Sequence, residues 1–262
     1  MKAQVKVILL LLTVVVAALA YALSPQQFSL GSYHLKKVSL LQLKKASIPH
    51  AATPKKKLAK KPSAPAKAEE AKPDTSRQVI LLFGDSMLEG LTRRLDDYTA
   101  ANGYELHTVI WYSSSTETWA TTATLEHYIA QYHPSYFLLC LGSNELFVND
   151  LDQRDQYIKT LVQKMGDKPF VWIGPPNWKE DTGIDQLICD NVGKGAYFDS
   201  SRLNLTRGKD GRHPTFSAAA GWADLIAKWM SSSQCDHPIK MDRPTKNGHA
   251  KVELLNPDFP GY

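Results

Sequence analysis

Four residues spread between positions 86 and 213 combine types that could do chemistry together. Ser86 lies in the run GDSM, Asn144 in the run GSNE, and Asp210 and His213 in the run DGRHP. A serine hydroxyl is a poor nucleophile unless a base takes its proton. A histidine held by a carboxylate is such a base, and a carboxylate three residues before it can accept its Nδ1 hydrogen bond. The set indicates nucleophilic catalysis by a serine.

The pattern of apolar residues predicts the elements that must position these side chains. From residue 78 onward, short apolar runs alternate with longer amphipathic segments, which is typical of a parallel α/β sheet. We expect strands near residues 78–83, 104–111, 135–141, 169–174 and 195–199. We expect helices near residues 87–102, 117–132, 151–165, 181–193 and 215–231. Residues 233–262 are rich in Pro, Asp, Lys and Asn and are expected to wrap the surface or fray.

This arrangement gathers the polar motifs at one edge of the sheet. Ser86 falls in the turn after the first strand, and Asn144 follows the third strand. Ligands of open α/β sheets bind at the carboxyl ends of the strands. There the Asn144 amide could donate to an oxyanion or only cap a turn. Taken alone, Ser86 could be a helix N-cap, and Asp210 with His213 an ordinary loop turn.

With all three motifs in view, residues 78 to 231 resemble the SGNH (GDSL-like) hydrolase family. The match lies in Gly84-Asp85-Ser86, Gly142-Ser143-Asn144 and Asp210-x-x-His213, in this order and on successive strand ends. The resemblance implies a flavodoxin-like three-layer α/β/α fold around a central parallel five-stranded sheet. It implies Ser86 as the nucleophile, His213 as general base and acid, Asp210 as its orienter, and Asn144 with the Ser86 backbone N–H as oxyanion donors. It implies no metal and no organic cofactor.

The chain departs from the family pattern after the second strand, where the family usually supplies a glycine whose backbone N–H completes the oxyanion hole. Here the run is WYSSST, and Ser113 is the expected counterpart, with Ser114 the next candidate. Because the donor is a main-chain group, a serine can replace glycine if the required backbone conformation is open to it.

Asn177 and Trp178 follow the fourth strand and should line the same cleft. They could contact a sugar ring by hydrogen bonding and stacking, or only pack within their loop. Other catalytic motifs are absent from the sequence. It has no Gly-x-Ser-x-Gly elbow, no phosphate loop and no HExxH, and His127 and His133 are six residues apart, so they do not share a helix face.

The charge is divided unevenly along the chain. Residues 1–78 carry fourteen basic and three acidic side chains, a net charge of +11, whereas the whole chain carries +5. Residues 79–262 therefore carry −6, which disfavours nucleic acid as a partner of the folded part.

The N-terminal region is expected to export the chain and tether it. Residues 7–23 are uncharged and follow Lys2 and Lys6. Seventeen apolar residues exceed a typical signal-peptide core of about 7–15 and reach the short end of a membrane span. We expect residues 1–23 to be an inner-membrane anchor with the catalytic domain on the periplasmic side. A cleaved signal and a secreted protein is the alternative, because Ala18-Leu19-Ala20 resembles a peptidase site.

Residues 24–77 are rich in Lys, Pro and Ala and are expected to form a disordered stalk, whose lysines could contact an anionic envelope polymer. The hydrolase domain is expected over residues 78–232, followed by the C-terminal extension 233–262. Cys140 should be buried in an apolar run, while Cys189 and Cys235 could pair in an oxidising compartment.

The expected function is hydrolysis of O-acyl esters, acetyl above all, on a cell-envelope or extracellular polysaccharide. Three alternatives remain open. The same residues would serve an O-acetyltransferase, a lipase or thioesterase would need a long apolar groove, and a catalytically silent envelope-binding module would need none of the four polar residues.

Overall fold

The computed structural model describes residues 29–30, 33–34, 72–249 and 251–262 of the 262-residue chain. The chain divides into two units, residues 1–66 and 67–262. In the first, β1 (Ser29–Leu30) pairs antiparallel with β2 (Tyr33–His34), within the range expected to be a stalk. The predicted anchor over residues 1–23 and most of the stalk lie outside the described residues. Among the helices described, none combines the length and hydropathy needed to cross a bilayer.

The second unit is built on a six-stranded parallel sheet with the order β7-β6-β5-β3-β4-β8. Its strands are β3 (Val79–Gly84), β4 (Glu105–Trp111), β5 (Tyr136–Cys140), β6 (Phe170–Ile173), β7 (Tyr197–Phe198) and β8 (Val252–Leu255). Apart from β8, at the edge, the order is that of a flavodoxin-like sheet. The predicted fold class is therefore confirmed, with six strands in place of five.

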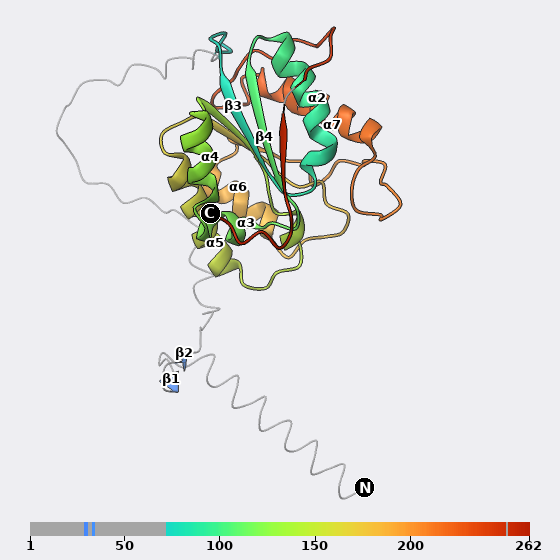
Figure 1. The fold of residues 1–262 in the computed structure, drawn as a ribbon. Coiled ribbons are helices and arrows are strands. Elements are labelled where there is room, and N and C mark those ends of the chain that lie inside the picture. Colours follow the sequence, from blue (N-terminus) through green and yellow to red (C-terminus); the bar gives the residue numbers. More distant parts are fainter. Residues whose placement is uncertain (1–28, 31–32, 35–71, 250) are drawn as a thin grey trace, which may run out of the picture. The chain divides into compact units, whose positions relative to one another are not determined.

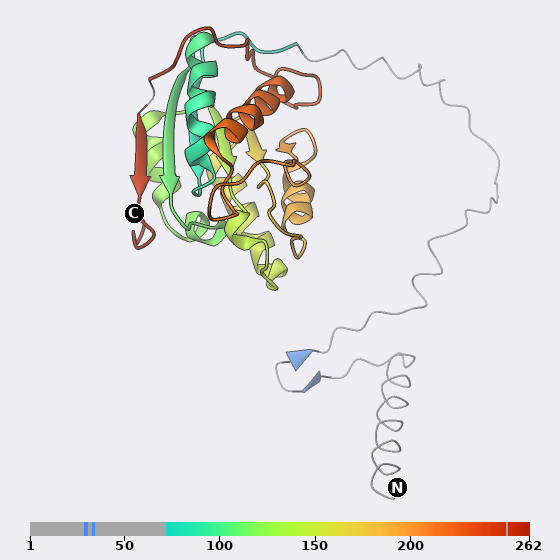
Figure 2. The ribbon, with the colours of Figure 1, turned by 90° about the vertical axis from the view of Figure 1, so that its right-hand side faces the viewer.

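Helices cover both faces of this sheet, so the unit has three layers (Figure 1). Helices α2 (Leu88–Ala101) and α7 (Phe216–Met230) lie side by side on one face, as Figure 2 shows. The other face carries α3 (Thr116–Thr121), α4 (Thr124–Tyr132), α5 (Leu151–Met165) and α6 (Ile184–Val192). Each face buries its own apolar core, with Trp222 and Ile226 in one and Trp119 and Ile158 in the other.

The helix expected over residues 117–132 is two helices, α3 and α4. The chain leaves helical geometry at Thr122, whose φ is −108° and ψ 164°. The hydroxyl of Thr122 contacts the carbonyl of Thr118 and the hydroxyl of Thr124 at 2.9 Å. Threonine side chains that bond nearby groups in this way compete with continued helix formation.

The C-terminal stretch does more than wrap the surface. Strand β8 pairs parallel with β4, and Glu253 on it accepts hydrogen bonds from Tyr128 and Tyr132. Tyr262 stacks on His127 at 3.6 Å between ring centroids. The sequence signal for β8 is weak because it is an exposed edge strand: Val252 and Leu254 are 41% and 58% exposed.

The folded region begins before residue 78, where the hydrolase domain was expected to start. Asp74, inside the range expected to be stalk, exchanges backbone hydrogen bonds with Pro238 and Lys240.

All three cysteines are free. Cys235 is buried in the core under α2 and α7, whereas Cys189 packs against the core on the opposite face. The sheet therefore separates the two thiols, and they do not pair.

Candidate active site

Ser86, His213 and Asp210 form a continuous chain of hydrogen bonds at the carboxyl edge of the sheet. Ser86 Oγ lies 2.8 Å from His213 Nε2, although the two residues are 127 positions apart. On the other side of the ring, His213 Nδ1 lies 2.5 Å from Asp210 Oδ2. The three side chains that the sequence predicted to act together thus form one hydrogen-bonded chain, with His213 in the middle.

The charge on Asp210 decides which way these bonds run. Its hydrogen bond from His213, together with backbone N–H donors of Arg212 and His213, lowers the pKa of Asp210 to about 2. An ionised carboxylate only accepts hydrogen bonds, so Nδ1 of His213 must donate to it. In the neutral imidazole Nε2 then carries the lone pair, which faces the hydroxyl of Ser86. This is the arrangement in which histidine takes the serine proton.

The turn that presents Ser86 depends on a glycine. Gly84 ends β3 with a φ of 155°, and a Cβ there would overlap the carbonyl oxygen of Cys140 on β5. The same carbonyl accepts the N–H of Asp85 at 3.1 Å. Close approach of the two strand ends sends the chain sharply into α2, which begins two residues after Ser86.

Asp85 ties this turn to the one after β5. It is fully buried; its Oδ1 accepts the N–H of Met87 at 2.9 Å, and its Oδ2 accepts the hydroxyl of Ser143. Burial raises the pKa of Asp85 to about 6, against the stabilising effect of these hydrogen bonds. Ser86 and Asn144 therefore lie on two turns joined by one carboxylate.

Asn144 lies beside the serine with one donor to spare. It belongs to the short 3-10 helix η1 (Ser143–Glu145), and its Nδ2 donates to the carbonyl of Ser114 at 2.9 Å. An amide nitrogen carries two hydrogens, so the other remains for a substrate oxygen. Asn144 lines a hollow of about 200 Å³ with Ser86, His213 and Trp178.

Ser113 adopts the conformation that the departure from glycine required. Its φ is 61°, in the left-handed region that a serine enters at some energetic cost. The N–H of Ser114, the other candidate, already donates to the carbonyl of Trp111 at 3.2 Å, whereas the N–H of Ser113 makes no hydrogen bond within the described part of the chain. Ser113 is exposed and is not among the residues that line the hollows beside Ser86.

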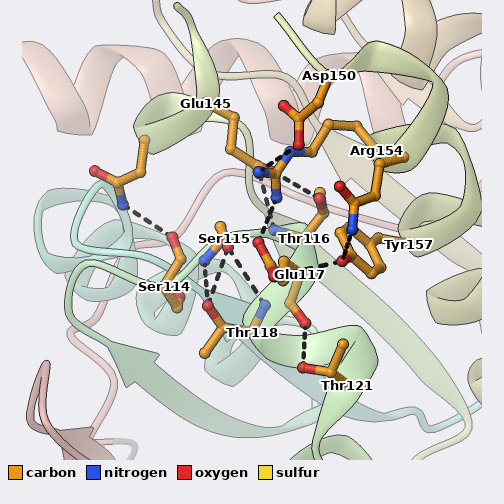
Figure 3. Close-up of polar contacts among 12 residues, drawn as sticks. Ser114, Ser115, Thr116, Glu117, Thr118, Thr121, Glu145, Asp150, Arg154 and Tyr157 are labelled. Atoms are coloured by element: carbon orange, nitrogen blue, oxygen red, sulfur yellow. Dashed lines mark hydrogen bonds and ion pairs between the residues drawn. The ribbon is translucent and has the colours of Figure 1, made fainter. Parts of the chain in front are cut away.

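A buried carboxylate braces the loop that carries Ser113 and Ser114 (Figure 3). Glu145, 1% exposed, accepts the N–H of Thr116 at 2.8 Å and its hydroxyl at 2.6 Å. Arg154 on α5 lies 3.3 Å from Glu145 and also pairs with Glu117 and Asp150. Burial raises the pKa of Glu145, and the hydrogen bonds from Thr116 oppose that rise. The next residue after Asn144 thus anchors the start of α3.

The structure separates the two residues predicted to meet a substrate. Trp178 lines the hollow beside Ser86, where its ring meets Phe147 edge-on at 6.2 Å and lies 5.8 Å from the Arg212 guanidinium. Asn177 does not line that hollow. Its amide donates to Asp185 at 2.5 Å and Asp181 at 3.2 Å, so it turns toward α6.

Arg207 is a site residue that sequence reasoning missed. Its guanidinium donates to the carbonyl of Arg212 at 2.7 Å and to those of Pro176 and Asn177 at 2.9 and 3.0 Å. It therefore joins the loop of His213 to the loop of Trp178. No motif pointed to it because its partners are backbone carbonyls, two of them about thirty residues away. Among the described residues, no group of three or more His, Cys, Asp or Glu side chains is placed to hold a metal ion.

Comparison with known proteins gives distant likenesses. No family model and no curated protein matches the sequence. A gut microbial diltiazem-metabolizing enzyme aligns with a TM-score of 0.44 and 14% identity over 62% of this chain and 49% of its own, so this chain spans about half its length. A protein described as lipolytic and of the G-D-S-L family, from Desulfitobacterium hafniense, aligns with a TM-score of 0.43 and 12% identity over 57% of this chain and 98% of its own.

Proposed function

We propose that this chain is a serine ester hydrolase of the SGNH type that cleaves O-acyl esters. The observation that carries the proposal is the hydrogen-bonded chain from Ser86 through His213 to the ionised Asp210, with an amide donor of Asn144 in the same hollow. Nucleophile, base, orienter and oxyanion donor together are what acyl transfer through a covalent intermediate requires.

The reaction would proceed in two halves. As Ser86 Oγ attacks the ester carbonyl, its proton passes to Nε2 of His213, and Asp210 stabilises the imidazolium that forms. The amide of Asn144 and the main-chain N–H of Ser86 would receive the oxyanion. His213 then gives the proton to the leaving alcohol. In the second half it activates a water that releases the acid from Ser86.

The space around Ser86 favours a short acyl group. A hollow of about 260 Å³, lined among others by Met87, Gly90 and Phe216, lies on one side of the serine, and the 200 Å³ hollow with Trp178 lies on the other. Both are smaller than the roughly 300 Å³ at which pockets for drug-sized ligands begin. An acetyl ester fits this limit better than the long chain of a lipid, and we propose acetyl as the acyl group.

The polysaccharide carrier and the extracytoplasmic location are proposed from the sequence. The apolar run of residues 7–23 and the basic region after it would place the domain among envelope polymers. Both segments are outside the described residues, apart from the short β1 and β2 and residues 72–77.

The proposal is tested by replacing the nucleophile. With p-nitrophenyl acetate, Ser86→Ala should lower kcat by about 10³-fold or more and abolish labelling by a serine-reactive fluorophosphonate. Ser217→Ala, at an exposed position on α7, is the matched control and should keep full activity and labelling. Full activity of Ser86→Ala would refute the mechanism. The absence of labelling of the native chain would favour a silent binding module.

A further inference from the structure

Three hollows adjoin one another, starting at the candidate nucleophile at the carboxyl edge of the sheet and ending beside the edge strand β7. The catalytic hollow, about 200 Å³, is lined by Ser86, His213 and Trp178 among others. The middle hollow, about 640 Å³, shares Trp178 with it and also includes Arg202. The distal hollow, about 760 Å³, shares Arg202 with the middle one, along with Asp181 and Ser201. These shared lining residues make the three hollows neighbours in a row that leads away from the serine.

The path is polar, with both kinds of hydrogen-bonding group in each part. The middle and distal hollows offer carboxylate acceptors and basic donors together with aromatic rings. The acceptors are Asp181, Asp185, Asp199 and Glu180, the donors are Lys179, Lys194 and Arg202, and the rings are Trp178, Tyr197, Phe198 and Trp229. A sugar hydroxyl both donates and accepts, and a sugar ring has an apolar face that packs on aromatic side chains. A lipid chain would need an apolar groove in place of these groups.

Two buried side chains of the distal hollow carry polar atoms with no partner. Asp185 and Tyr197 are 8% and 6% exposed. One carboxylate oxygen of Asp185 and the hydroxyl of Tyr197 make no hydrogen bond within the described part of the chain. Buried polar groups are nearly always satisfied in folded proteins, and one that is not calls for an explanation, of which a bound water or ligand hydroxyl is one. The distal hollow therefore has features of a ligand site beyond its acidic residues.

We propose that the path from Trp178 to the distal hollow binds the sugar chain that carries the ester, with at least one sugar of the leaving group between Arg202, Asp199 and Tyr197. This rests on the proposed function, since it assigns the leaving group of the same reaction. The sugar chain would enter the site beside Ser86 and continue along the ends of β6 and β7. Specificity for a polymer would then come from residues remote from the reacting ester.

The test compares substrates of increasing sugar length on the full-length chain. The probes are O-acetylated cello-, xylo- and manno-oligosaccharides of one to six sugars, with p-nitrophenyl acetate as the small ester. We expect kcat/KM for acetate release to rise at least tenfold from one sugar to four in at least one series, mainly through KM. Arg202→Ala should lower the ratio of kcat/KM on the four-sugar substrate to that on p-nitrophenyl acetate by about tenfold.

Two further variants separate binding from general damage. Tyr197→Phe removes the unpartnered hydroxyl and keeps the ring, and it should lower the same ratio. Arg77→Ala is the matched control, because Arg77 is a 75% exposed arginine just before β3, at the opposite edge of the sheet. It should leave the ratio unchanged. Calorimetric binding of the unacetylated six-sugar chains to Ser86→Ala provides a readout independent of turnover.

The outcomes distinguish this inference from the proposed function. Equal kcat/KM for one and four sugars in all three series, or no binding of any six-sugar chain, overturns the path while Ser86-dependent hydrolysis stands. If neither Arg202→Ala nor Tyr197→Phe changes the dependence of kcat/KM on sugar length, the sugar chain leaves the site by another route, which also overturns the proposed path. A preference for longer acyl chains without any effect of sugar length points to a lipid and overturns it too. If Ser86→Ala keeps full activity on p-nitrophenyl acetate, it is the proposed function that fails.

Discussion

Replacing Asp85 with asparagine tests the view that a buried carboxylate joins the two catalytic turns. The introduced asparagine would keep an oxygen to accept the N–H of Met87, and its amide could donate to the hydroxyl of Ser143, which in the wild type donates to Asp85. Asp85→Asn thus preserves the shape and the contacts of the turn and removes the charge. We expect the variant to fold and to lose part of the pH dependence of stability.

The magnitude follows from the pKa of Asp85, which burial raises from 3.8 to about 6. Below pH 3.8 the carboxyl is protonated in both the folded and the unfolded state, and its contribution to stability is fully present. That contribution is lost as the pH rises through about 6, because the folded state must then hold a buried charge. A shift of about two pKa units corresponds to about 3 kcal/mol, of which about 2 kcal/mol falls between pH 4 and pH 8.

Urea unfolding followed by tryptophan fluorescence at pH 4, 6 and 8 measures this quantity. The wild-type free energy of unfolding should fall over this range, and the fall should be smaller in Asp85→Asn by about 2 kcal/mol. Asp185, whose pKa burial raises to about 7, adds a similar loss in both proteins and cancels in the comparison. Asp258→Asn, at an exposed position, should behave as wild type. Parallel pH profiles for wild type and Asp85→Asn would refute the reasoning.

Three further substitutions test single contacts. Asp210→Asn should lower kcat on p-nitrophenyl acetate by about 10³–10⁴-fold because His213 loses its orienter, and an unchanged kcat would contradict the assigned tautomer. Asn144→Ala should lower kcat by about 10²–10³-fold with a smaller change in KM. A change in KM alone would contradict the assignment of Asn144 as an oxyanion donor. Gly84→Ala should destabilise by several kcal/mol in urea unfolding, since its Cβ would overlap the Cys140 carbonyl; Gly221→Ala, with open space around it, should not.

Local sequence patterns were enough to predict most of the elements and three of the motifs. All five predicted strands exist, and the helix expected over residues 151–165 matches α5. These predictions succeed because a buried parallel strand is apolar on both faces and a surface helix is apolar on one, so each carries its own signature. Ser86, Asn144, Asp210 and His213 were found because each lies next to such an element.

Tertiary structure decided the features that depend on partners distant in the chain. β8 is a strand because β4 offers it an edge, and Asn177 leaves the catalytic hollow because Asp181 and Asp185 compete for its amide. Arg207 becomes part of the site only through carbonyls that the fold brings to it. No pattern within a short stretch of sequence encodes such contacts.

Ser86 shows the division most plainly. Its residue type and its place after an apolar strand made it the candidate nucleophile. Its hydrogen bond to a histidine 127 residues later exists because α7 packs beside α2, the helix that follows β3, which brings the loop before α7 to the end of β3. The sequence by itself determined which residues could react, whereas the packing of strands and helices decided which of them meet, because that depends on contacts summed over the whole sheet.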